Sequence, residues 1–173
     1  ERVPKKQENL ASFSSGGPTL DGRIKPEVVA PGESIISAVP IGDGAESECA
    51  TEKKTGTSMA TPLVAGTAAI ARQYLVENRN QTPSSALLKA VLINGARPLT
   101  GFESNGYPLE PPPSHRQGFG RLDLSNSLPL AGNFSLVLKD ERELLSTGQL
   151  EGTCLYVSSS QKDLRITISW IDP

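Results

Sequence analysis

The chain has 173 residues, of which 21% are charged, and a formal net charge of −2. That length is sufficient for one domain with a core, or for one domain and part of a second. Its 17 Lys and Arg residues are scattered, which excludes the basic stripe of a nucleic-acid-binding protein. No apolar run approaches the roughly 18 to 20 residues of a membrane-spanning helix.

The N-terminal stretch, "ERVPKKQENL", has neither an initiator Met nor the apolar core of a signal peptide. It predicts a segment from the interior of a longer chain. The two cysteines, Cys49 and Cys154, have no CxxC spacing and no nearby histidine, which excludes a zinc ribbon and favours two thiols over one disulfide. Sequons at Asn80 and Asn133 favour a secreted or secretory-pathway protein.

The first 48 residues are rich in Gly, Pro and Ser, which indicates turns, and the runs "EVVA" and "SIISAV" predict short strands between them. Residues 42–54 are polar and predict a surface loop. From Ser58 to about Val76 the residues are apolar or small on nearly every side, which predicts a buried helix. Because Pro62 is tolerated only in the first turn, this helix should begin near Ser58.

A second helix is predicted after Thr82 as N-cap and Pro83 as first helical residue, with Gly95 closing its end. The proline-rich loop that follows leads into "GFGRLDLSNSL", which predicts a short turn and then a strand or a last helical turn. Beyond about Leu130, the runs "FSLVL", "TCLYV" and "LRITISW" predict the first strands of an antiparallel β-sandwich. Trp170 alternates in phase with aliphatic residues and is predicted to lie in the core.

Three predicted strands are too few to bury both faces of a sandwich. We therefore expect the chain to be incomplete at both ends. We also expect it to expose apolar surface and to associate with itself.

Ser58 lies two residues after Gly56 and stands at the start of the predicted buried helix. As a helix cap it would need no further role. A serine nucleophile, however, needs unpaired backbone N–H groups near its reacting carbonyl, and the first turn of a helix supplies them. The position therefore suits either a cap or a nucleophile.

The segment "GTSMATPLVAG", residues 56–66, resembles the active-site serine signature of the subtilases (peptidase S8), the subtilisin-like serine proteases, at every fixed position of that pattern. "ASFSSGGP", "KPEVVAPG" and "GFGRLDL" are similar to neighbouring family segments, so the likeness covers about residues 10–130. The β segment ending in "LRITISWIDP" is similar to the jelly-roll β-sandwich that follows some subtilase domains. The resemblance implies an α/β fold: residues 1–130 as the C-terminal portion of a mainly parallel sheet with flanking helices, and residues 131–173 as the truncated start of a β-sandwich.

The resemblance implies that Ser58 is the nucleophile of a serine endopeptidase, with its backbone N–H as half of an oxyanion hole and Met59 packed behind it. In subtilases the catalytic Asp and His precede the serine, and no histidine precedes Ser58 here. We therefore expect this chain alone to be inactive. The longer protein would cleave proteins or peptides, with the N-terminal part of the same catalytic domain as a partner.

The sequence leaves three alternatives open. His115 follows the serine, as in an α/β-hydrolase, with Glu77, Glu103 or Glu110 as the acid, although the polar approach to Ser58 is unlike that fold and a solvated histidine is expected. The chain could instead belong to a catalytically silent pseudo-protease, or its β-sandwich could be a binding module.

The acidic loop holding Asp43, Glu46 and Glu48 lacks the spacing of an EF-hand and predicts solvated carboxylates. The family resemblance implies that structural calcium is compatible with the longer protein, and that the chemistry itself needs no cofactor. No phosphate-binding loop is present in the sequence.

Overall fold

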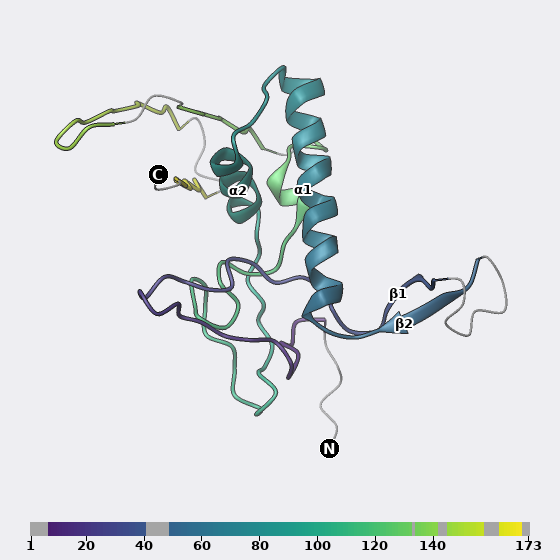
Figure 1. The fold of residues 1–173 in the computed structure, drawn as a ribbon. Coiled ribbons are helices and arrows are strands. Elements are labelled where there is room, and N and C mark those ends of the chain that lie inside the picture. The colour runs from purple at the N-terminus through teal and green to yellow at the C-terminus, as the bar shows by residue number, and fades with distance from the viewer. Residues whose placement is uncertain (1–6, 41–48, 133, 142–144, 158–162, 171–173) are drawn as a thin grey trace.

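The computed structural model describes residues 7–40, 49–132, 134–141, 145–157 and 163–170. In chain order the elements are β1 (Ile35–Ala38), β2 (Thr51–Lys54), α1 (Thr57–Arg79), α2 (Ser85–Asn94) and α3 (Leu124–Ser127) (Figure 1). The three helices lie together, and the β1–β2 hairpin projects away from the N-terminal end of α1.

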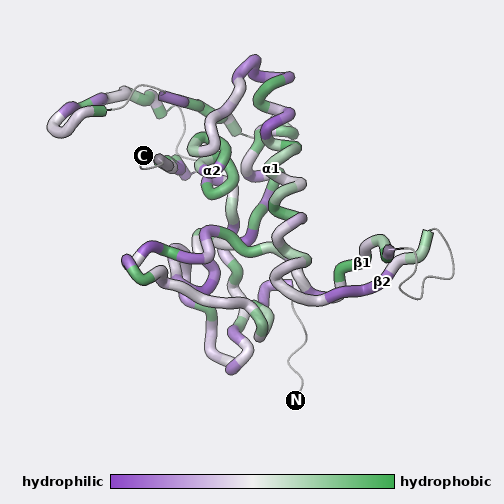
Figure 2. The backbone as a smooth tube through the Cα atoms, viewed as in Figure 1, coloured by the Kyte–Doolittle hydropathy of each residue, from purple (hydrophilic) through white to green (hydrophobic). Residues whose placement is uncertain are grey.

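The main core lies between the C-terminal half of α1 and the two shorter helices. Its buried residues are Ala71, Leu75, Leu87, Val91, Leu92 and Leu128. Hydrophobic residues recur along both α1 and α2 (Figure 2), and the two helices contact one another in this core. Both predicted helices are thus confirmed, and they pack against one another through their buried residues in this core.

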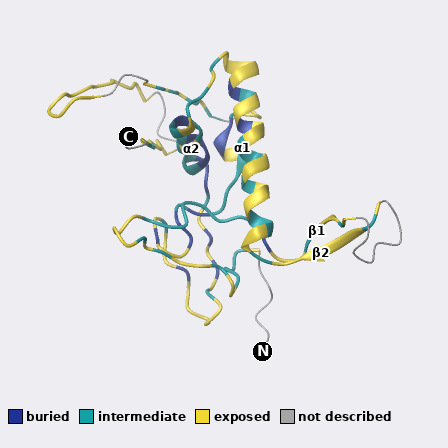
Figure 3. Cartoon of the chain, viewed as in Figure 1, coloured by how far each residue is buried: buried dark blue, intermediate teal, exposed yellow. Residues whose placement is uncertain are grey.

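The prediction that the first helix is buried on nearly every side is wrong for the described structure. Only Ala71 and Leu75 of α1 are buried, and Figure 3 shows most of the helix exposed. Leu63, Ile70 and Val76 are among its exposed apolar residues. The reason is that the helices packed on α1 within the described residues, α2 and α3, meet its C-terminal half.

The start of α2 differs by two residues from its predicted start. Ser84, rather than Thr82, is the N-cap, and its hydroxyl accepts a hydrogen bond from the Leu87 amide at 3.1 Å. The carboxylate of Asp140 in turn accepts from the Ser84 amide at 2.8 Å and from the Ser84 hydroxyl at 2.5 Å. Gly95 closes the helix as predicted.

The predicted mainly parallel sheet is not seen among the described residues, where the named strands form one antiparallel hairpin with Ile35 opposite Lys54. The run "SIISAV" forms β1 as predicted. Residues 51–54, expected in a loop, form β2 because their backbone groups pair with β1. The run "EVVA" contributes a single parallel bridge between Val29 and Arg121.

A second compact region is built from loops around one buried amide. The side chain of Gln117 is fully buried, and its Nε2 donates to the carbonyls of Leu99 at 3.2 Å and Glu110 at 2.7 Å. Its Oε1 accepts from the Leu99 amide at 2.8 Å. This side chain ties residues 99–118 together where regular backbone pairing is scarce.

The predicted β-sandwich is not confirmed, since the described residues beyond 130 hold no strand. Leu136 and Leu138 instead pack against the helical core, and Arg79 donates to the Leu136 carbonyl at 2.9 Å. The prediction that Trp170 is a core residue is wrong: its side chain is 70% exposed. A strand face becomes buried only when another layer covers it, and no described residue supplies that layer.

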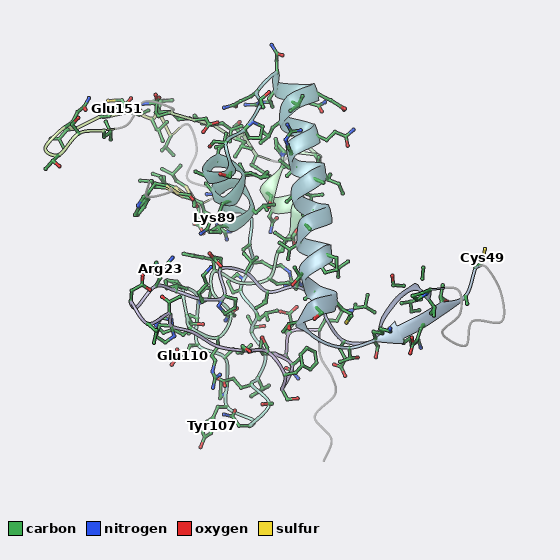
Figure 4. The ribbon with its side chains drawn as sticks, viewed as in Figure 1. Arg23, Cys49, Lys89, Tyr107, Glu110 and Glu151 are labelled. Atoms are coloured by element: carbon green, nitrogen blue, oxygen red, sulfur yellow. The ribbon has the colours of Figure 1, made fainter. Side chains whose placement is uncertain are left out.

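Both thiols are free and exposed in the structure. Figure 4 labels Cys49 at the far end of the β1–β2 hairpin. Cys154 belongs to the extended stretch beyond the helices.

Candidate active site

Ser58 is the second residue of α1 and is exposed. The N-cap of the helix is Gly56, and no side chain caps this end by a hydrogen bond. The interpretation of Ser58 as a helix cap is therefore wrong. The Ser58 hydroxyl therefore lies at the N-terminal end of α1 and does not cap the helix.

Gly56 holds the chain in a conformation that favours glycine. Its φ of 154° and ψ of 169° lie in a region that other residues enter at a cost of about 1–3 kcal/mol. The amide of Gly56 donates to the Gly32 carbonyl at 2.8 Å. A Cβ on Gly32 would lie 2.7 Å from the Gly56 oxygen, so two glycines allow this close approach.

Gly32 was missed by the sequence reasoning as a residue of the site. Its signals in the sequence are the Pro-Gly turn "APGES" and its place at the end of "KPEVVAPG", a segment similar to the family. Next to it, the Ser34 amide donates to the Thr55 hydroxyl at 2.9 Å. These two contacts fix the loop before β1 against the turn that leads into α1.

The first turn of α1 presents backbone N–H groups beside Ser58. Thr57 and Ser58 are the first two helical residues, so their amides have no carbonyl one turn earlier in the helix. The N-terminal end of the 23-residue helix also carries a partial positive charge. This arrangement can stabilise an oxyanion that forms next to the serine hydroxyl.

Met59 is half-buried directly after Ser58, and its amide donates to the Gly56 carbonyl at 3.1 Å. A Cβ added to Gly56 would lie 3.8 Å from the Met59 sulfur, so the thioether packs beside the turn. An exposed strand, β2, leads into the same turn, and its Lys54 and Glu52 pair at 3.4 Å.

The structure does not assemble a base from the candidates after Ser58. His115 is exposed in the loop before Gln117, as expected. Glu103 pairs with Arg116 at 3.2 Å, and Glu77 accepts from the Gln73 amide at 3.0 Å. Within the described part of the chain, no hydrogen bond joins His115 to an acidic side chain.

No group of three or more His, Cys, Asp or Glu side chains among the described residues is placed to hold a metal ion. The acidic loop with Asp43, Glu46 and Glu48 lies outside the described residues, as does the sequon residue Asn133. Asn80 is exposed and ends α1 in the left-handed conformation. Across the described ranges, no helix is long and apolar enough to cross a membrane.

Comparison with known proteins identifies a family for most of the chain. Residues 4–120 match the model of the subtilase family. The chain is 42% identical over 114 residues to the serine protease/ABC transporter B family protein tagB of Dictyostelium discoideum, a match that covers 55% of this chain and 6% of the relative. It is 39% identical over 117 residues to the C5a peptidase of Streptococcus pyogenes, covering 66% of this chain and 9% of that protein.

Among solved structures, the CspB protease of Clostridium perfringens is similar, with a TM-score of 0.52 and 31% identity. The match covers 70% of this chain and 23% of the CspB chain. The chain thus spans 6%, 9% and 23% of the lengths of these three proteins.

Proposed function

Because the chain belongs to the subtilase family, we propose that Ser58 is the nucleophile of a serine endopeptidase that hydrolyses protein or peptide substrates through an acyl-enzyme. The observation that carries this proposal is the placement of an exposed, uncapping serine at the N-terminus of α1, after the Gly56 turn. The protease names of its relatives support the reaction class.

In the proposed reaction, the Ser58 oxygen attacks the carbonyl carbon of the scissile peptide bond while its proton passes to a general base. The oxyanion of the tetrahedral intermediate accepts a hydrogen bond from the Ser58 amide in the first turn of α1. Collapse of the intermediate breaks the C–N bond, and the base returns its proton to the leaving amine. Water then attacks the acyl-enzyme and regenerates the Ser58 hydroxyl.

The base and its orienting acid are proposed to come from sequence outside these 173 residues. The only histidine of the chain, His115, follows Ser58, whereas the catalytic histidine of subtilases precedes the serine. A serine without a base stays protonated and weakly nucleophilic. The chain alone is therefore proposed to be inactive, and the longer protein active.

Secretion and structural calcium in the longer protein remain proposals as well. The exposed position of Asn80 is compatible with a glycosylated, secreted protein.

The Met59 thioether beside Ser58 is proposed as the oxidation-sensitive group of the site.

Labelling with a fluorophosphonate probe tests the proposal directly. The probe is applied to this chain and to the longer protein, and the labelled residue is mapped by mass spectrometry. We expect labelling of Ser58 in the longer protein, none in this chain, and none after Ser58→Ala. Ser84→Ala is the matched control, because the Ser84 hydroxyl is engaged at the start of α2.

Absence of labelling in both proteins would overturn the proposal and favour the pseudo-protease alternative. Labelling of this chain alone would show that a base lies within it, and His115→Ala would then identify that base.

A further inference from the structure

A cleft of about 1220 Å³ lies between residues 22–27, the C-terminal part of α2 and the extended segment 164–170. Ser58 is not among its lining residues. Figure 4 labels Arg23 and Lys89, which lie on the loop and on α2. The function proposed above makes no use of this cleft.

Most of the charged side chains that line the cleft are cationic. They are Arg23, Lys25, Lys89 and Arg165, against the single carboxylate of Glu27. Lys25 and Lys89 share that carboxylate, at 2.6 and 2.8 Å, so one of these two charges is not neutralised. Arg23 pairs with Asp21 at 2.8 Å.

Arg165 contributes a second uncompensated charge. Its Nη1 donates to the carbonyls of Asn94 at 3.3 Å and Ala96 at 3.2 Å. Neither acceptor carries a charge, and no ion pair joins Arg165 to another described residue. A guanidinium has five N–H donors in a planar fork, so donors remain for a carboxylate.

The wall formed by residues 164–170 is both apolar and extended. Ile166, Ile168 and Trp170 are exposed along it, whereas Thr167 and Ser169 are half-buried. No backbone–backbone hydrogen bond joins residues 163–170 to any other described residue. Apart from the Arg165 carbonyl, which accepts from the Asn94 side chain at 3.3 Å, its amides and carbonyls are therefore available to a second extended chain.

We propose that this cleft binds an acidic peptide segment in an extended conformation, beside residues 164–170 and with its carboxylates at Arg165, Lys25 and Lys89. A peptide fits these observations because it can pair with the free backbone of residues 164–170, cover the apolar wall and neutralise the surplus positive charge together. A partner that carries only negative charge would neither pair with the free backbone nor cover the apolar wall.

Trp170 makes the proposal testable, because it is the only tryptophan of the chain and lines the cleft. The chain is titrated with a short, end-blocked peptide of alternating glutamate and valine while the Trp170 emission is recorded. We expect a saturable change that weakens as salt is added. Arg165→Gln and Lys25→Gln should each raise Kd about tenfold, since each removes a charge-assisted hydrogen bond.

The controls separate this site from other sources of binding. Arg72→Gln, on the exposed face of α1, should leave Kd unchanged. Ser58→Ala should also leave Kd unchanged, so the test of this cleft does not depend on whether Ser58 is the nucleophile. Because Arg165→Gln also loosens segment 164–170, Lys25→Gln serves as the second variant: it keeps those contacts and leaves Glu27 paired with Lys89. Equal binding of a lysine–valine peptide or of a thymidine oligonucleotide, or equal Kd values for Lys25→Gln and Arg72→Gln, would overturn the proposal.

Discussion

Asn94 and Arg165 exchange hydrogen bonds at the C-terminal end of α2. The Asn94 side-chain amide donates to the Arg165 carbonyl at 3.3 Å, and the Arg165 guanidinium donates to the Asn94 carbonyl at 3.3 Å. At the other end of the helix, the Asp140 carboxylate binds Ser84. An anion at the N-terminus and a cation at the C-terminus both match the helix dipole, so residues beyond 130 stabilise α2 at both ends.

The contact between Asp140 and Ser84 should contribute measurably to the free energy of unfolding. Asp140→Asn keeps the shape of the side chain but removes its charge from the start of α2, so we expect a loss of about 1 kcal/mol in the free energy of unfolding. Urea denaturation measures this loss. Glu141→Gln, the exposed neighbour, is the control, and equal effects of the two variants would contradict the helix-end account.

Two glycines of the serine segment should respond with opposite sign to alanine. Gly56→Ala should destabilise the chain by about 1–3 kcal/mol, because alanine is strained at a φ of 154°. Gly66→Ala should stabilise it by about 0.5–1 kcal/mol, since Gly66 lies inside α1 with nothing within 4 Å of an added Cβ. Thermal unfolding of the two variants compares them, and a shift in the same direction would count against the geometry described for Gly56.

The buried amide of Gln117 should be costly to remove. Gln117→Leu leaves the Leu99 amide and the Glu110 carbonyl without these partners, and we expect a loss of about 2–4 kcal/mol. The same change at exposed Gln73 removes only its bond to Glu77 and should cost less than about 0.5 kcal/mol. Denaturation curves of both variants measure the two losses in the free energy of unfolding. A loss at Gln73 as large as the loss at Gln117 would contradict the prediction.

Glu27 should make stability depend on acid pH. Burial opposes its ionisation, but hydrogen bonds from Lys25 and Lys89 outweigh that effect and lower the pKa of Glu27 from 4.5 to about 2. A carboxyl with a lowered pKa in the folded state stabilises that state fully above its unfolded value. This contribution is therefore present above pH 4.5 and is lost as the pH falls towards about 2.

We expect the contribution of Glu27 to be on the order of 1–2 kcal/mol, allowing for solvent screening of the exposed lysines. Urea unfolding of wild type and Glu27→Gln across that pH range measures it. The difference between the two proteins should shrink as the pH falls, and a constant difference would refute the assignment.

The exposed apolar surface should drive self-association. Leu63 and Ile70 on α1, and Ile166 and Ile168 near the C-terminus, are all exposed, and apolar surface of this extent is unfavourable in water. Light scattering over a dilution series should show a mass that rises with concentration. A mass that stays monomeric at every concentration would contradict this expectation.

The helices and the serine segment could be predicted from local signals. Pro62 limits where α1 begins, Gly95 closes α2, and the pattern around Ser58 identifies the family that residues 4–120 match. Contacts between distant segments have no such signal. Neither the bond between the Gly56 amide and the Gly32 carbonyl nor the binding of Asp140 to Ser84 could be predicted.

Sequence by itself determined the helix that carries Ser58 and the family, because helix signals and motif residues act within a few positions of one another. Only the tertiary structure decided that α1 is largely exposed, that Gly56 rather than a side chain caps it, and that Trp170 faces solvent. Burial depends on which other segments lie against a residue. An alternating or apolar pattern specifies which face of a segment is apolar, whereas the tertiary fold determines whether anything covers that face.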